Sequence, residues 1–172
     1  SRDLKKLTEI INEQKLNPKY IVNTHWHDDH TRGNEELAKE LSVKIVQHDA
    51  SDLKNDMTVS DGDSIKFGCS ELAVYHTPGH SKDSICLVGD GKIFSGDTLF
   101  VGNCGRIDLP GGSSRELYHS LFDVIANLND DLVLYPGHNY GSDVTSTIGS
   151  EKRTNLVMQK ISEAEFIERM DG

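Results

Sequence analysis

Residues 24–30, which read THWHDDH, concentrate metal-binding side chains directly after a short apolar run. Imidazole nitrogens and carboxylate oxygens are the ligands that zinc, iron, nickel and manganese accept in proteins. In an extended backbone, side chains two residues apart point to the same side, so His25 and His27 can reach one ion. Asp29 and His30 lie further along the chain and can face a second ion.

Three later motifs add further candidate ligands, and each comes where a predicted strand passes into a loop. They are His80 in TPGHS, Asp97 in SGDTLF and His138 in YPGHN. Gly79 and Gly137 allow the backbone to turn sharply just before the two histidines. The candidates then number seven, which is too many for one tetrahedral ion and fits two ions that share one carboxylate.

Other side chains in and around these motifs have plainer interpretations. Trp26 and Asp28 alternate with the candidate ligands, so we expect them to point away from the metals. The isolated histidines His48, His76 and His119 lack a motif and are expected to be structural or solvent-exposed.

The elements around the motifs predict a mixed α/β protein. A strand at 20–23, a helix at 33–41 and a strand at 43–46 indicate a βαβ unit. A helix is expected before it, from 3 to 16, because apolar residues recur at helical spacing there. The later chain is predicted to contain strands at 64–67, 71–75, 84–88, 92–95 and 131–135, helices at 115–127 and 162–170, and a glycine-rich loop at 102–114.

Length and composition place limits on the function. The chain has 172 residues, 35% of them hydrophobic and 27% charged, which fits one domain spanning 1–172. Its formal net charge of −10 argues against nucleic-acid or anionic-membrane binding. We see no apolar run long enough to span a bilayer and no signal-peptide pattern. The three cysteines form no C-x-x-C pair, so a reducing, cytoplasmic setting is expected.

The motifs together resemble the metallo-β-lactamase fold superfamily, whose H-x-H-x-D-H signature corresponds to residues 25–30. The wording of TPGHS, SGDTLF, CGRIDLPGG and YPGHNYG is similar to the glyoxalase II group and to its relatives, the persulfide dioxygenases. The resemblance runs from about Tyr20 to Asn155. It implies an αββα sandwich, in which two sheets face each other and helices lie outside.

The resemblance to glyoxalase II implies a role for each candidate. One metal ion would bind His25, His27 and His80, a second would bind Asp29, His30 and His138, and Asp97 would bridge them. Zinc is the expected metal, with iron or manganese as alternatives. A hydroxide between the ions would attack a thioester carbonyl, with Asp29 and Asp97 as the catalytic carboxylates. Arg106 and Tyr140 fall where the family places substrate contacts.

The resemblance to persulfide dioxygenases implies a different reaction from nearly the same residues. A single iron would bind His25, His80 and Asp97, which leaves coordination positions open for oxygen. The remaining candidate ligands would then support the site by hydrogen bonding without contacting the iron. A nuclease-type member, which the negative charge disfavours, and a metal-binding domain without turnover are the other readings.

Two departures from the family pattern bear on the substrate. The superfamily usually has about three strands before its first helix, whereas this chain opens at the helix, so we expect a fold without the usual first strands and an N-terminally trimmed domain. The glutathione-binding helical domain of glyoxalase II has no counterpart after Asn155, and the step Asn155-Leu156-Val157 lacks the basic residue expected in the dioxygenases. We therefore expect a small thioester or thiol substrate, and the sequence does not identify the thiol that carries the acyl group. We also expect the chain to form a homo-oligomer.

Overall fold

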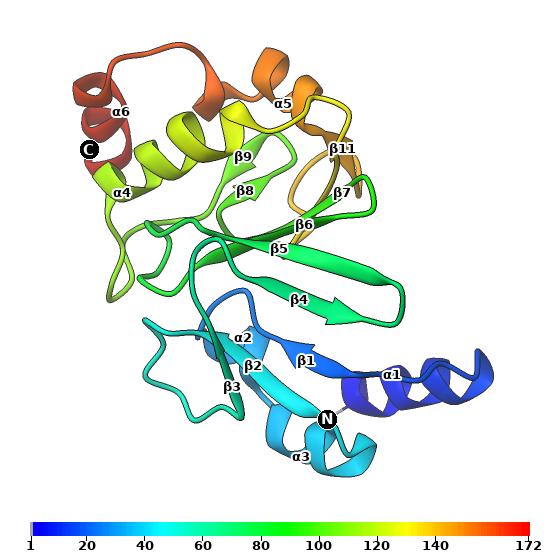
Figure 1. Ribbon diagram of the computed structural model, residues 1–172. Helices are drawn as coiled ribbons and strands as arrows, with labels where there is room; N and C mark the ends of the chain where they lie inside the picture. Colours follow the sequence, from blue (N-terminus) through cyan, green and yellow to red (C-terminus); the bar gives the residue numbers. More distant parts are fainter. Residues whose placement is uncertain (1) are drawn as a thin grey trace.

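The computed structural model describes residues 2–172. Within them, two main β-sheets pack face to face with helices outside them, and a third, two-stranded sheet accompanies them (Figure 1). The smaller sheet is parallel throughout, in the order β1 (Tyr20–Val22), β2 (Lys44–His48) and β3 (Met57–Val59). Helix α3 (Asn34–Leu41) connects β1 to β2, which confirms the predicted βαβ unit. The αββα architecture expected from the resemblance is therefore present.

The larger sheet brings three strand ends to one edge. Its order is β11 (Ser146–Thr147), β10 (Val133–Pro136), β7 (Lys92–Gly96), β6 (Ile85–Gly89), β5 (Ser70–His76) and β4 (Ser64–Phe67). Both β5 and β7 run antiparallel to β6, and β10 runs parallel to β7. The carboxyl ends of β5, β7 and β10 therefore meet at the same edge, and each leads into a motif that carries a candidate ligand.

The strands predicted at 64–67 and 71–75, and those predicted at 84–88 and 92–95, form two hairpins of this sheet. Strand β4 pairs with β5, and β6 pairs with β7. The second hairpin turns at Asp90 and Gly91, whose φ angles are 48° and 72°. Two successive positive φ values are what a two-residue type I′ turn requires, and they match the right-handed twist of the strands.

Two apolar cores hold the layers together. Between the sheets, Val46 and Val59 of the smaller sheet belong to the same buried cluster as Val74 and Leu87 of the larger one. On the other face of the larger sheet, a second cluster joins the strands to the outer helices. Successive strand residues point to opposite faces, so Cys86 contributes to the outer core while its neighbour Leu87 contributes to the inner one.

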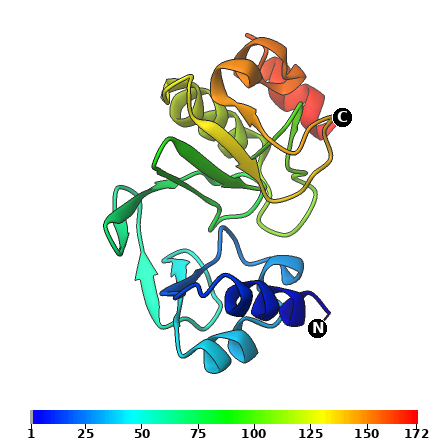
Figure 2. The ribbon, with the colours of Figure 1, turned by 90° about the vertical axis from the view of Figure 1, so that its right-hand side faces the viewer.

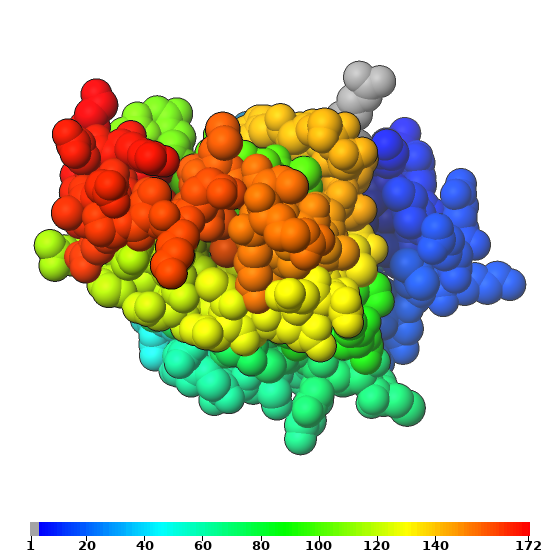
Figure 3. Space-filling view, turned by 90° about the horizontal axis from the view of Figure 1, so that it is seen from above, coloured from blue at the N-terminus to red at the C-terminus, as the bar shows by residue number. Residues whose placement is uncertain are grey.

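The outer helices are α4 (Ser114–His119), α5 (Ile148–Thr154) and α6 (Glu163–Asp171), and they cover one face of the larger sheet (Figures 2 and 3). The regular helix predicted at 115–127 is only partly correct. After α4 the chain widens into a π turn at Ser120–Val124 and then tightens into a 3₁₀ turn at Ile125–Asn127. The apolar residues recur every four positions, at Leu117, Leu121 and Ile125, and all three are fully buried. An α-helix of 3.6 residues per turn would rotate that spacing away from the core, and a wide turn offsets the rotation.

Several boundaries and short elements differ from the prediction. Helix α1 (Arg2–Glu13) ends earlier than expected, and Lys15 follows it with a φ of 52°. A one-turn helix, α2 (Asp28–Thr31), lies where a loop was expected, and the glycine-rich loop begins with a hairpin of β8 (Leu99–Phe100) and β9 (Asn103–Cys104). The 3₁₀ turn Leu156–Met158 follows α5. None of the helices within residues 2–172 has the length and apolar character that crossing a bilayer requires.

Candidate metal centre

The seven candidate ligands converge at the edge where the two sheets meet. His25 and His27 follow β1 of the smaller sheet, and Asp29 and His30 lie in α2 directly after them. The other three come from the larger sheet: His80 follows β5, Asp97 follows β7 and His138 follows β10. Within the described residues, these side chains form groups whose ligand atoms lie within 4.8 Å of one another.

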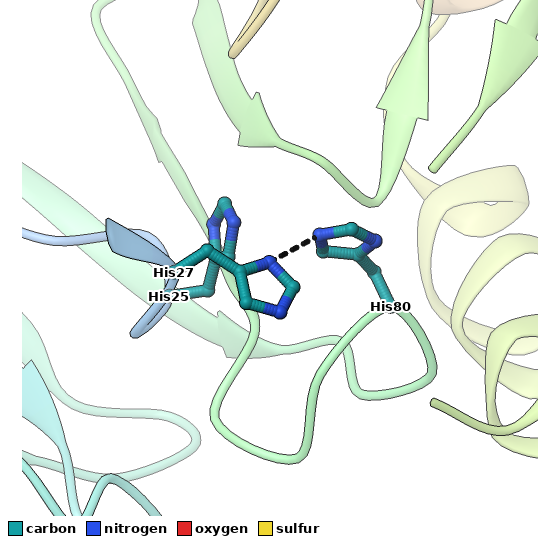
Figure 4. Close-up of side chains that lie close together, drawn as sticks. All are labelled: His25, His27 and His80. Carbon is teal, nitrogen blue, oxygen red and sulfur yellow. Dashed lines mark hydrogen bonds between the residues drawn. The ribbon is translucent and has the colours of Figure 1, made fainter. Parts of the chain in front are cut away.

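The first group consists of His25, His27 and His80 (Figure 4). All three are buried, with exposed fractions of 1%, 9% and 2%. Nε2 of His80 lies 2.9 Å from Nδ1 of His27. The second ring nitrogen of His80, Nδ1, donates to the carbonyl oxygen of Arg106 at 2.6 Å, which fixes the ring and leaves Nε2 free to bind a cation.

The second group consists of Asp29, His30 and His138, and it is more open to solvent. Nε2 of His30 lies 3.0 Å from Nε2 of His138, and Nε2 of His138 lies 3.3 Å from Oδ2 of Asp29. The side chain of Asp29 is 61% exposed, whereas that of His30 is 16% exposed. These two groups match the division of ligands that the resemblance implies, and a third group, formed by His25, His30 and Asp97, connects them. Their binding of metal stays a prediction.

The carboxylate of Asp97 lies between the two groups. Its Oδ2 is 3.6 Å from Nε2 of His80 in the first group and 3.4 Å from Nε2 of His138 in the second. Its Oδ1 is 3.4 Å from Nε2 of His30. Oδ2 is thus near both groups and Oδ1 near the second, so the carboxylate lies where a ligand that bridges two ions would lie.

The donor atoms fit a metal ion because several of them have nothing else to bind. Among the described residues, Nε2 of His25, Nε2 of His27 and Oδ1 of Asp97 are buried without a hydrogen-bonding partner. A buried polar atom that lacks a partner carries a desolvation cost of about 1–3 kcal/mol. Ligands at about 2.0–2.1 Å from a tetrahedral ion lie about 3.3 Å from each other, close to the separations in both groups. The residues present therefore fit divalent metal ions.

Burial keeps the histidines in the form that binds metal. Desolvation, together with the neighbouring imidazoles, lowers the pKa of His25 from 6.5 to about 2. Burial lowers the pKa of His80 from 6.5 to about 4, and it also lowers those of His27 and His30. Desolvation raises the pKa of Asp97 from 3.8 to about 6. Neutral imidazoles offer a lone pair, so the groups are ready to accept a cation at neutral pH.

Two glycines allow the backbone to approach the ligands closely. A Cβ atom at Gly137 would lie 2.3 Å from Oδ1 of Asp97 and 3.0 Å from the ring of His30. A Cβ atom at Gly105 would lie 2.8 Å from Nδ1 of His80. Any larger residue at these positions would push a candidate ligand out of place, so the glycines are part of the site.

A cavity of about 630 Å³ opens over both groups. The predicted substrate contacts Arg106 and Tyr140 line it, and the guanidinium of Arg106 is held by hydrogen bonds to Asp108. Trp26 also lines this cavity, with its ring 4.7 Å from that of His27. The expectation that Trp26 points away from the metal region is therefore wrong, because β1 ends at Val22 and the chain bends at Thr24 and His25, so the strict alternation of an extended strand does not reach Trp26.

Sequence reasoning missed part of the cavity wall. The remaining lining residues are Asp28, Phe100, Asn103, Cys104 and Leu109, together with the candidate ligands His27, Asp29, His80, Asp97 and His138. Burial raises the pKa of the Cys104 thiol to about 12, so this sulfur stays protonated at neutral pH. Phe100 and Cys104 belong to the β8–β9 hairpin, and the signal that could have pointed to them is their place in the motifs, since Phe100 ends SGDTLF and Cys104 begins CGRIDLPGG.

Comparison with known proteins places these motifs in context. The sequence pattern of the Metallo-beta-lactamase superfamily matches residues 2–138. The chain is 35% identical over 150 residues to the human mitochondrial persulfide dioxygenase ETHE1. This alignment covers 86% of this chain and 59% of that protein. It is 40% identical over 137 residues to the hydroxyacylglutathione hydrolase of Tolumonas auensis, which covers 77% of this chain and 52% of that protein.

A solved structure agrees closely with the fold. The crystal structure of ETHE1 from Myxococcus xanthus superposes with a TM-score of 0.94 at 30% sequence identity, over 99% of this chain and 76% of that one. The chain spans between about half and two thirds of the length of the curated relatives that it matches. On the match to the superfamily pattern and the shared fold, the chain belongs to the metallo-beta-lactamase superfamily.

Proposed function

We propose that this protein is a metallohydrolase that cleaves a thioester of the hydroxyacyl-thiol type with two divalent metal ions, most readily zinc. The observation that carries the proposal is the carboxylate of Asp97, which has one oxygen near His80 of the first group and contacts His30 and His138 of the second. A shared carboxylate between two complete groups of ligands is the arrangement that a binuclear hydrolase requires.

The metal ions would supply a hydroxide nucleophile at neutral pH and polarise the thioester carbonyl. The protein's own contribution is to hold the ligands in fixed orientations. The carbonyl of Arg106 orients the His80 ring, and Thr24 Oγ1 lies 3.2 Å from Nδ1 of His25. Arg106 and Tyr140 would contact the substrate over the cavity. A thiolate is a good leaving group, so the site needs no strong general acid.

Metal analysis combined with thioester hydrolysis tests this proposal. We expect about two zinc ions per chain after reconstitution, and cleavage of a hydroxyacyl thioester at neutral pH. Asp97→Asn should abolish both the second ion and the activity, whereas His119→Gln, on an exposed helix surface, should change neither. A protein that is loaded with two metal ions and leaves thioesters intact would refute the hydrolase assignment.

A second candidate function is an iron-dependent persulfide dioxygenase. The observation in its favour is the extent of similarity: relatives named persulfide dioxygenase align over 86–95% of this chain, whereas the hydroxyacylglutathione hydrolases align over 70–78% of it. Under this proposal His25, His80 and Asp97 would bind a single iron. It predicts one iron per chain and oxygen consumption with a persulfide, and full activity of a zinc-only protein on thioesters would exclude it.

A further inference from the structure

Two buried polar residues behind the cavity belong neither to the ligands nor to the predicted substrate contacts. Glu151 in α5 is 2% exposed, and Asn155, which ends that helix, is fully buried. The amide nitrogen of Asn155 donates to Oε2 of Glu151 at 2.8 Å. Burying a carboxylate and an amide is costly unless hydrogen bonds satisfy them, so we looked for the hydrogen-bond partners of this pair.

Apart from the backbone N–H of Val157, which donates to Oδ1 of Asn155 at 3.0 Å, the partners of the two side chains lie in the β8–β9 hairpin. Oε2 of Glu151 accepts a hydrogen bond from the backbone N–H of Gly102 at 2.8 Å. The side-chain amide of Asn155 donates to the carbonyl oxygens of Phe100 at 3.2 Å and Asn103 at 3.1 Å. Glu151 and Asn155 thus hold the hairpin at both its strands and its turn.

The hairpin needs this support because it is very short. Each strand has two residues, and a two-stranded hairpin of any length is at best marginally stable alone. Gly102 at the turn has a φ of 79°. The three hydrogen bonds from the buried pair therefore contribute much to fixing the position of residues 99–104.

The same hairpin forms one wall of the metal cavity. Phe100, Asn103 and Cys104 line the cavity, and the Phe100 ring lies 5.3 Å from that of Tyr140. The loop that carries Tyr140 also rests on the hairpin, because a Cβ atom at Gly141 would lie 2.6 Å from the carbonyl oxygen of Val101. A shift of the hairpin would move both this wall and the predicted substrate contact Tyr140.

The metal ligands are held largely by other contacts, and the hairpin touches one of them through the Phe100 ring, 6.1 Å from that of His138. The backbone N–H of Gly137 donates to the carbonyl oxygen of Gly96 at 2.8 Å, and this bond holds the segment that carries His138 against the one that carries Asp97. His80 is oriented by the carbonyl of Arg106. Loosening the hairpin should therefore change how the substrate is held while leaving the ligand groups in place.

We propose that Glu151 and Asn155 are positioning residues that fix the substrate-facing wall of the cavity through the β8–β9 hairpin. The proposal rests on the proposed function in one respect, since substrate affinity is measured on the thioester reaction. A structural role in stability alone would lower folding, metal content and activity together. Positioning predicts instead that the Michaelis constant rises while the turnover number and the metal content stay the same.

The test compares variants of the metal-loaded full chain. Glu151→Ala should raise KM about tenfold with kcat within about twofold, the loss expected when buried donors are left without their acceptor. Glu151→Gln should behave as the wild type, because an amide oxygen still accepts from Gly102 and Asn155. Glu168→Ala, on the exposed surface of α6, is the matched control. An unchanged KM in Glu151→Ala, or an equal loss of kcat and bound metal, would overturn the proposal.

Amide hydrogen exchange of residues 99–104 gives a readout that does not depend on turnover. Exchange should be slow in the wild type and in Glu151→Gln, and at least about tenfold faster in Glu151→Ala. If that variant fails to fold, Asn155→Ala replaces it, because it removes both donors of Asn155 without placing a second carboxylate against Glu151. Slow exchange in that folded variant would refute the proposal. A wild type that cleaves no thioester would reject the proposed function, and the exchange result would still decide the role of the pair.

Discussion

Acidification should destabilise the metal-free protein, because the folded chain buries several histidines in their neutral form. The pKa of His25 is lowered to about 2 and that of His80 to about 4, from 6.5 in each case. Below pH 6.5 the unfolded chain takes up protons at these positions and the folded chain does not. The free energy of unfolding therefore falls as the pH falls through that window.

The size of the effect follows from these pKa values. Between pH 7.5 and 5.5, each of the two histidines costs about 1.4 kcal/mol, since one pH unit below the unfolded pKa is worth 1.36 kcal/mol per proton. Asp97 acts in the opposite direction, because its pKa is raised to about 6 and its protonation in the folded state restores about 0.8 kcal/mol. The net loss is about 2 kcal/mol. Burial also lowers the pKa values of His27 and His48, and both add to the loss.

Urea unfolding of the chelator-treated protein measures this change. The fluorescence of Trp26, the single tryptophan, reports the transition. The midpoint should move to lower urea between pH 7.5 and 5.5, and in His25→Gln the loss should fall below about 1 kcal/mol because one of the two dominant groups is gone. A free energy of unfolding that stays constant or rises on acidification would refute the reasoning. The same dependence in His25→Gln as in the wild type would show that other groups cause it.

Three further predictions address the site and the core. Gly137→Ala should reduce bound metal in an otherwise folded protein, because its Cβ would lie 2.3 Å from Oδ1 of Asp97; elemental analysis measures this, and a full metal complement would contradict it. Arg106→Gln should raise KM for the substrate and leave the melting temperature within about 1 °C, since its exposed ion pair with Asp108 contributes little to stability; an unchanged KM would remove Arg106 from the substrate contacts. Leu134→Ala should lower the free energy of unfolding by about 2–5 kcal/mol in chemical denaturation, because the side chain is fully buried in the outer core; a loss under about 1 kcal/mol would show that the core refills the space.

The sequence predicted the site well where a metal-binding residue type directly follows a recognisable strand. The ligand motifs at 25–30, His80, Asp97 and His138 each follow a strand, and the strands were recognisable from their apolar runs. Because the carboxyl ends of β5, β7 and β10 meet at one edge, finding the strands was enough to bring these motifs together. The hairpin turn at Asp90 and Gly91 was equally readable, because few residues adopt its backbone conformation.

The features that were missed depend on packing between distant segments. The position of Trp26 depends on where the extended backbone ends, and the one-turn helix α2 is too short to leave a periodic pattern. The π turn after α4 is a compromise between helix geometry and the core, which a local pattern does not reveal. Glu151 lies in α5, a helix that was not predicted, and Asn155 ends that helix; only their hydrogen bonds to a hairpin about 50 residues earlier set them apart.

The distribution of the ligands also affects how the protein folds. The site draws on residues from His25 to His138, from both sheets, so it is complete only after widely separated segments have docked. Loop closure of that length is slow, and contacts distant in sequence form late on the folding pathway. Few metal ligands would therefore be assembled in the transition state for folding. A metal ion would stabilise the native protein mainly by slowing its unfolding.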